Sequence, residues 1–303
     1  MSNLRNKVRA GQFVITAEIV PPLSAAGMKL LHEAGQLKGR VDAINLTDAA
    51  AGKTSMSSFA AAAILVAHGH EPILQVTCRD RNRIALAGDL IGAAAQGVEN
   101  LLILKGDDPK GGDQPNAKPV FDYESIELLA LARDLRDQGT LPSGRKVEPA
   151  PTFFIGGADV PRRPDAKWSP IGLQKKIEAG ADFVQTQFCF DLDVARAYID
   201  RLRADGILDK LAVIIGVGPI RSAKSARWMN ENLFGVHIPD PLIARLEKAQ
   251  DQRAEGRRIC VELLQELSEI DGIAGAHLMA PKQEQACAEV IAESGLLARR
   301  KAA

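Results

Sequence analysis

Residues 13–22 read FVITAEIVPP, and this stretch introduces the pattern that decides the fold. Its apolar run is interrupted by Glu18, and the pair Pro21 and Pro22 ends the strand directly afterwards. Polar residues mark the other apolar runs in the same way: Thr47 after AINL, Gln75 and Thr77 in ILQVTC, Asp107 after LLILKG, and Gln187 after FVQT. The downstream ends of the strands in a parallel barrel meet at one mouth, where these side chains would face a single ligand. The pattern therefore predicts an enzyme.

Short apolar runs alternate with amphipathic stretches along the whole chain, which is typical of repeated βα units and a parallel sheet. We predict strands at residues 13–18, 43–46, 73–77, 101–105, 152–155, 183–187, 212–216 and 275–278. Helices are predicted between them, at residues 26–37, 56–68, 81–96, 123–138, 172–179, 194–204, 222–232 and 283–294. Eight such pairs predict an α/β protein with a closed (β/α)8 TIM barrel as one domain over residues 1–303.

The segment at about residues 239–271 is too long for a loop. The spacing of its leucines and isoleucines is that of an amphipathic helix, so we expect one or two extra helices before the last strand. We interpret the segment as a helical insertion and not as a second domain.

Composition narrows the class of partner. The 38 Lys and Arg balance the 38 Asp and Glu, and no long basic block occurs, so neither a nucleic acid nor a membrane surface is expected as partner. No apolar run reaches the roughly 20 residues of a spanning helix, and the start MSNLRNKVRAGQF lacks an apolar signal core. We expect a cytoplasmic protein that binds a small molecule.

The four cysteines are scattered, without a CxxC pair or a His at ligand spacing, so we expect neither a metal nor a disulfide framework. Cys189 would be a nucleophile only with a His close in space, and a small apolar filler is the favoured interpretation. The AGKTS stretch at residues 51–55 ends like a phosphate-binding P-loop, but Thr47 stands where the first Gly is required.

Three strand ends could carry chemistry. Glu18 lies in an apolar strand, where a carboxylate needs a charged partner, a path to solvent or a proton; a general acid and a structural ion pair with Lys or Arg are both open. Gly106 would let the backbone approach a flat ligand beside Asp107, although a turn of Gly, Asp and Pro also forms without function. Gln185 and Gln187 share one face of their strand, and an amide suits a heterocycle that both donates and accepts.

Six collinear motifs together resemble the methylenetetrahydrofolate reductase family: TAEIVPP at 16–22, NLTDAAAG at 45–52, QVTCRDRN at 75–82, LKGDDP at 104–109, TQFCFD at 186–191 and GVGPI at 216–220. The resemblance runs from about Gly11 to Leu278. It implies a (β/α)8 barrel with a flavin, FAD or alternatively FMN, that is reduced by NADH or NADPH. The reduced flavin would then convert 5,10-methylenetetrahydrofolate to 5-methyltetrahydrofolate by ping-pong hydride transfer.

The resemblance also implies roles for individual residues. Glu18 matches the general acid that protonates N10 of the folate, and Asp107 matches the residue beside the flavin and the pterin. Gln187 matches a pterin-binding amide, and Met229 stands where an aromatic residue covers folate or nicotinamide. The remaining matches are flavin contacts: Thr47, Gln75, Lys105, Gly106 and Lys176.

The chain also departs from the family pattern. Gln75 replaces a frequent His, Asp48 a frequent Tyr and Ser169 an Asp. The flavin form, the electron donor, homo-oligomerisation and a biosynthetic or catabolic role, such as methionine biosynthesis, are therefore left open. Two other classes are also open: a flavin-free, pterin-dependent barrel methyltransferase or lyase, and a flavin-binding subunit of an electron-transfer complex.

Overall fold

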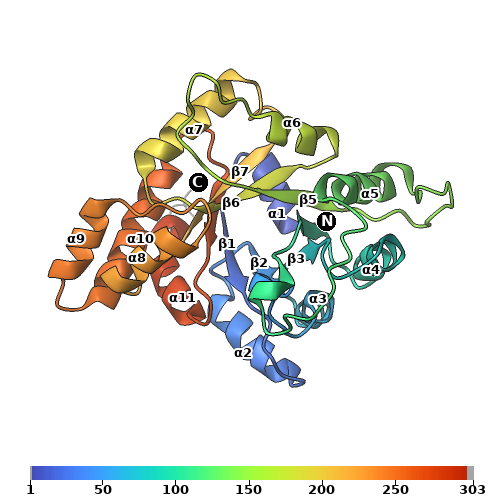
Figure 1. Cartoon of the computed structure of the whole chain (residues 1–303), viewed down its shortest axis with the longest axis horizontal. Helices are drawn as coiled ribbons and strands as arrows, with labels where there is room; N and C mark the ends of the chain where they lie inside the picture. Colours follow the sequence, from blue (N-terminus) through green and yellow to red (C-terminus); the bar gives the residue numbers. More distant parts are fainter. Residues whose placement is uncertain (1, 299–303) are drawn as a thin grey trace.

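Eight parallel strands close into a barrel in which each strand pairs with the next along the chain (Figure 1). The computed structural model describes residues 2–298. The strands are β1 Val14–Ile19, β2 Ala43–Leu46, β3 Pro72–Thr77, β4 Asn100–Leu104, β5 Phe154–Asp159, β6 Phe183–Phe188, β7 Ala212–Val217 and β8 Gly275–Leu278. The predicted (β/α)8 TIM barrel is confirmed.

Helices surround the barrel. They are α1 Asn3–Arg9, α2 Gly27–Leu37, α3 Ser58–Ala67, α4 Arg83–Ala95, α5 Ser125–Gln138, α6 Ile171–Glu178, α7 Leu192–Ala204, α8 Ala223–Asn232, α9 Asp240–Lys248, α10 Gln252–Ser268 and α11 Glu284–Glu293. Helices α9 and α10 are the expected extra helices before the last strand, and Figure 1 shows them beside α8. Helix α1 was not predicted, because its seven residues, about two turns, offer too little apolar periodicity.

The barrel interior begins with an apolar layer at the N-terminal ends of the strands. Phe154 and Phe183 stack there with ring centroids 4.8 Å apart. A Cβ on Gly156 would lie 2.3 Å from the Phe183 ring, so β5 needs glycine at this position. The other buried members of the layer are Leu4, Val14, Ala43, Ile73, Leu102 and Ile214. This apolar layer fills the barrel at the N-terminal ends of its strands, so the candidate site is sought at the C-terminal ends.

Candidate active site

Glu18 lies at the C-terminal end of β1, as expected. Its Oε2 atom accepts a hydrogen bond of 3.1 Å from Nε2 of Gln75 on β3. The Nε2 atom of His277 on β8 lies 3.8 Å from the same oxygen, and the Glu18 side chain is 15% exposed. No Lys or Arg within residues 2–298 forms an ion pair with Glu18, which leaves the structural ion pair without support.

Asp107 lies on the loop after β4, where the backbone turns toward the mouth. Its Oδ2 atom accepts a hydrogen bond of 2.8 Å from the backbone N–H of Ala51, on the loop after β2. Gly106 has a φ of +95°, and a Cβ there would lie 2.9 Å from the Cβ of Arg79. Glycine is therefore required for this turn, and the turn fixes where Asp107 leaves the strand.

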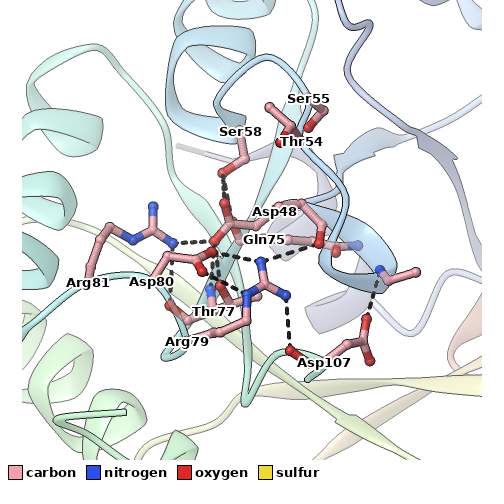
Figure 2. Close-up of polar contacts among 12 residues, drawn as sticks. Asp48, Thr54, Ser55, Ser58, Gln75, Thr77, Arg79, Asp80, Arg81 and Asp107 are labelled. Carbon is pink, nitrogen blue, oxygen red and sulfur yellow. Dashed lines mark hydrogen bonds and ion pairs between the residues drawn. The ribbon is translucent and has the colours of Figure 1, made fainter. Parts of the chain in front are cut away.

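Arg79 follows β3 and joins these two loops, although its side chain is only 2% exposed. Its guanidinium donates to the backbone oxygens of Ala49 and Asp107, each at 3.3 Å, and to the Asp80 carboxylate at 2.7 Å (Figure 2). The hydrogen bond that Arg79 donates to the Asp80 carboxylate raises the pKa of Arg79 above its usual value, so the guanidinium stays charged. Three neighbouring strand ends are thus held by one buried cation.

The loops after β2 and β4 also touch directly. Ala49 and Ala51 have φ values of +50° and +53°, which is left-handed backbone that alanine adopts at a cost. The Oδ1 atom of Asp113 accepts hydrogen bonds from the N–H and hydroxyl of Thr54 at 2.9 and 3.1 Å. A strained turn is therefore held in place by contacts on both sides.

Asp48 was missed as a site residue from the sequence. Its buried carboxylate accepts hydrogen bonds from the backbone N–H and hydroxyl of Thr77, at 2.8 and 2.9 Å, and from the Ser58 hydroxyl at 3.2 Å. It also forms an ion pair with Arg81 (Figure 2). Asp48 therefore ties the end of β2 to the end of β3. The sequence signal available for this pair was an acidic residue after β2, Asp48, and a basic residue after β3, Arg81.

Two features of this mouth are open to a ligand. The hydroxyl of Thr47 is buried and has no hydrogen-bond partner within the described chain, so it is left for a ligand. A cavity of about 330 Å³ lies against Lys105, Gly106 and Phe121 on the loop after β4. These residues fit an extended aromatic cofactor with polar edges.

Lys176 lies apart from this group, on α6. Its Nζ is 3.9 Å from the Asp159 carboxylate at the end of β5, and Asp159 also accepts a hydrogen bond from the Tyr198 hydroxyl. A Cβ on Gly157 would lie 3.2 Å from Cδ of Lys176, so the side chain lies across the β5 backbone. This cation faces the side of the mouth near β5.

The two expected substrate residues occupy different surroundings. The Oε1 atom of Gln187 accepts a hydrogen bond of 2.9 Å from the backbone N–H of Phe188, and its amide nitrogen has no partner among residues 2–298. Gln187 thus has donors left for a ligand. Met229 packs against the buried cluster of α8, α9 and α10, next to Trp228, which is 54% exposed.

All four cysteines are free and buried. Burial raises the pKa of Cys189 to about 11, and its thiol donates to the backbone oxygen of Asp191 at 3.4 Å. A thiol with a raised pKa is rarely deprotonated near neutral pH and is a poor nucleophile. This supports the interpretation of Cys189 as a small apolar filler. Residues 2–298 contain no cluster of three His, Cys, Asp or Glu suited to a metal ion. Over the same range no helix could span a bilayer.

A cavity of about 750 Å³ lies at the opposite end of the barrel, against Arg9, Asp182, Lys210 and Asp271. None of the strand-end residues expected to bind cofactor or substrate lines it. Active sites of this fold lie at the C-terminal ends of the strands, and conserved features at the other end serve stability. The chemistry is therefore assigned to the mouth that holds Glu18 and Asp107.

The family model described as methylenetetrahydrofolate reductase matches residues 3–295. The chain belongs to this family. Methylenetetrahydrofolate reductase 1 of Schizosaccharomyces pombe is 26% identical over 92% of the chain, and a probable NADPH-dependent reductase of Caenorhabditis elegans is 27% identical over 80%. These alignments cover 45% and 35% of the two relatives, so the chain spans less than half of their lengths.

A bacterial relative, 5,10-methylenetetrahydrofolate reductase of Salmonella typhimurium, is 25% identical over 69% of the chain and 65% of its own length. Among solved structures, an uncharacterised Clostridium thermocellum protein that binds two copies of 5-methyl-5,6,7,8-tetrahydrofolic acid has a TM-score of 0.63. It is 16% identical, and 99% of each chain is covered, so this likeness supports the fold alone.

Proposed function

We propose that this protein reduces 5,10-methylenetetrahydrofolate to 5-methyltetrahydrofolate with electrons from NADH or NADPH, through a bound flavin. Family membership supports the reaction. The observation that carries it to this chain is the position of Glu18. Its carboxyl group has no Lys or Arg partner in the part of the chain that the structure describes, and it lies at the mouth where Asp107 and Gln187 also lie.

The flavin, FAD in the first instance and FMN as the alternative, would supply the hydride that passes between nicotinamide and folate. Thr47, Lys105 and Gly106 would hold it beside the loop after β4, and Lys176 would pair with a phosphate group. Gln75 is the weakest of the five expected contacts, because its Nε2 already donates to Glu18.

The chain's own residues would handle the proton and the substrate. Glu18 would donate a proton to N10 of the folate, which opens the five-membered ring to an electrophilic iminium. The free amide donors of Gln187 would bind the pterin. The Asp107 carboxylate, held by Ala51, would oppose negative charge on a reduced cofactor and so favour departure of hydride.

Anaerobic spectroscopy of the purified protein tests this proposal. We expect a yellow protein that NADH or NADPH bleaches and that methylenetetrahydrofolate reoxidises, with 5-methyltetrahydrofolate as product. The same titration identifies the donor, and the spectrum of the released cofactor separates FAD from FMN. A colourless protein that binds neither added flavin would refute the proposal and favour the pterin-dependent methyltransferase.

A second candidate is a flavin-binding subunit of an electron-transfer complex. Met229 favours it, because a thioether replaces the aromatic side chain expected to cover nicotinamide. Rapid reduction of the isolated chain by either nicotinamide would exclude dependence on a partner subunit.

A further inference from the structure

The layer of the barrel interior above the apolar base is polar. Thr16, Asn45, Gln75, Gln185 and His277 point inward two residues beyond the base positions, and each is at most 6% exposed. Interiors of such barrels are usually filled by branched apolar side chains. A buried polar group without a partner destabilises the folded protein, so this belt needs internal hydrogen bonds.

Four of these residues, all except Gln75, make such hydrogen bonds in one continuous chain. The amides of Asn45 and Gln185 pair with each other at 2.5 and 3.1 Å. Nε2 of Gln185 also donates to the Thr16 hydroxyl at 3.0 Å, and that hydroxyl lies 2.9 Å from Nδ1 of His277. In one arrangement that satisfies both groups, the Thr16 hydroxyl accepts from Gln185 and donates its single proton to Nδ1 of His277. The imidazole proton is then on Nε2, and we take this tautomer as the premise for the role of His277.

That Nε2–H faces Glu18. It lies 3.8 Å from Oε2, the atom that also accepts the 3.1 Å hydrogen bond from Gln75. Two N–H donors thus converge on one carboxyl oxygen, and a carboxylic acid proton on that oxygen would oppose both of them. The proton of the acid is directed to Oε1 instead.

We propose that His277 and Gln75 are positioning residues that make Oε1 of Glu18 the oxygen that holds and delivers the proton. The inference rests on the proposed role of Glu18 as the acid. In the transfer the Oε1–H bond breaks, an N–H bond forms at N10, and the electron pair stays on the carboxylate. The same two donors then stabilise the new negative charge. Catalytic hydrogen bonds are often long before substrate binds, and we expect the 3.8 Å contact to shorten when the folate is bound.

Two substitutions of His277 distinguish a role in positioning the Glu18 proton from a role in packing the barrel interior. The amide of His277→Gln reaches the Nε2 position and keeps a donor toward Glu18, whereas His277→Asn reaches only the Nδ1 position. We expect His277→Asn to slow reoxidation of the reduced flavin by methylenetetrahydrofolate about 10- to 100-fold, part of the ~10²- to 10⁴-fold that general acid catalysis supplies, and His277→Gln by less than about threefold. The exposed His237→Asn is the matched control, with no expected effect.

Reduction of the flavin by nicotinamide is the internal reference, because Glu18 takes no part in it. Equal slowing by both His277 variants, or none in His277→Asn, would overturn the proposal for His277. Gln75→Met should slow reoxidation to a similar extent. An effect of Gln75→Met on flavin reduction alone would assign Gln75 to the flavin and overturn its positioning role.

Nitrogen-15 chemical shifts of the His277 ring test the belt without any turnover. We expect a protonated Nε2 and an unprotonated Nδ1 in the wild-type protein, and the opposite tautomer would overturn the inference. If wild-type protein is not reoxidised by folate at all, the proposed function fails. The tautomer measurement still decides whether the belt directs a proton donor toward Glu18.

Discussion

Replacing Glu18 by Gln removes one proton and little else. The Gln amide oxygen can take the place of Oε2, which accepts from Gln75 at 3.1 Å and lies 3.8 Å from Nε2 of His277. The amide nitrogen then occupies the Oε1 position and cannot deliver a proton to an amine. General acid catalysis contributes ~10²- to 10⁴-fold, so we expect a rise of about 3 to 5 kcal/mol in the barrier to folate reduction.

The assay is anaerobic stopped-flow absorbance at the flavin band, with each half-reaction followed separately. We expect flavin reduction by NADH or NADPH to keep its wild-type rate in Glu18→Gln, while reoxidation by methylenetetrahydrofolate falls by the stated factor. Reoxidation within tenfold of wild type would refute the reasoning, since about 1.4 kcal/mol is too little for loss of an acid. Equal loss in both half-reactions would refute it too, because it would place Glu18 in the flavin site.

Four further predictions concern the mouth and the core. Arg79→Met removes two charged hydrogen bonds to loop carbonyls, so we expect the free energy of unfolding measured with urea to fall by about 3 kcal/mol. An unchanged urea midpoint would contradict this prediction. In Gly112→Ala the new Cβ would lie 1.8 Å from a backbone oxygen of the loop after β2, so flavin affinity should fall, whereas Gly111→Ala has open space and should match wild type. Burial raises the pKa of Cys78 and Cys189 to about 11, so iodoacetamide at pH 8 should label neither in the folded protein. Stability should fall as the pH rises from about 8.5 toward 11, because the unfolded thiols lose their protons first.

The barrel could be predicted because strand and helix periods, and the polar strand ends, are local features of the sequence. Strands β2 and β8 have the predicted bounds. Strand β5 does not, since it begins at Phe154 and continues to Asp159 where the prediction covers residues 152–155. Glycine disfavours strands by propensity, but Gly156 is selected by the Phe183 ring of the next strand. That contact is tertiary, so the sequence does not show it.

The positions of the candidate residues in the fold could be predicted from the sequence, but their contacts could not. The mouth holds Glu18, Gln75 and Asp107, as expected. Their hydrogen-bond partners depend on the register of neighbouring strands and on the conformation of the loops. The contacts of the site join segments that are far apart in the sequence. They are the hydrogen bond from Gln75 to Glu18, the hydrogen bond from the Ala51 N–H to Asp107, and the hydrogen bonds of the polar belt. Side-chain alternation along β1 and β8 was the available signal for the belt, because Thr16 and His277 occupy inward positions.

The interlocked turns after β2 and β4 have a dynamic consequence. A Cβ on Gly112 would overlap the oxygen of Gly52, so the two turns lie backbone against backbone, and the amide protons of Ala51 and Thr54 end on carboxylates of the other turn. Neither turn can swing outward without releasing the other. We therefore expect the two turns to open together, so that these amides exchange with deuterium at a common rate. A bound cofactor would raise the free energy of this opening and slow the exchange.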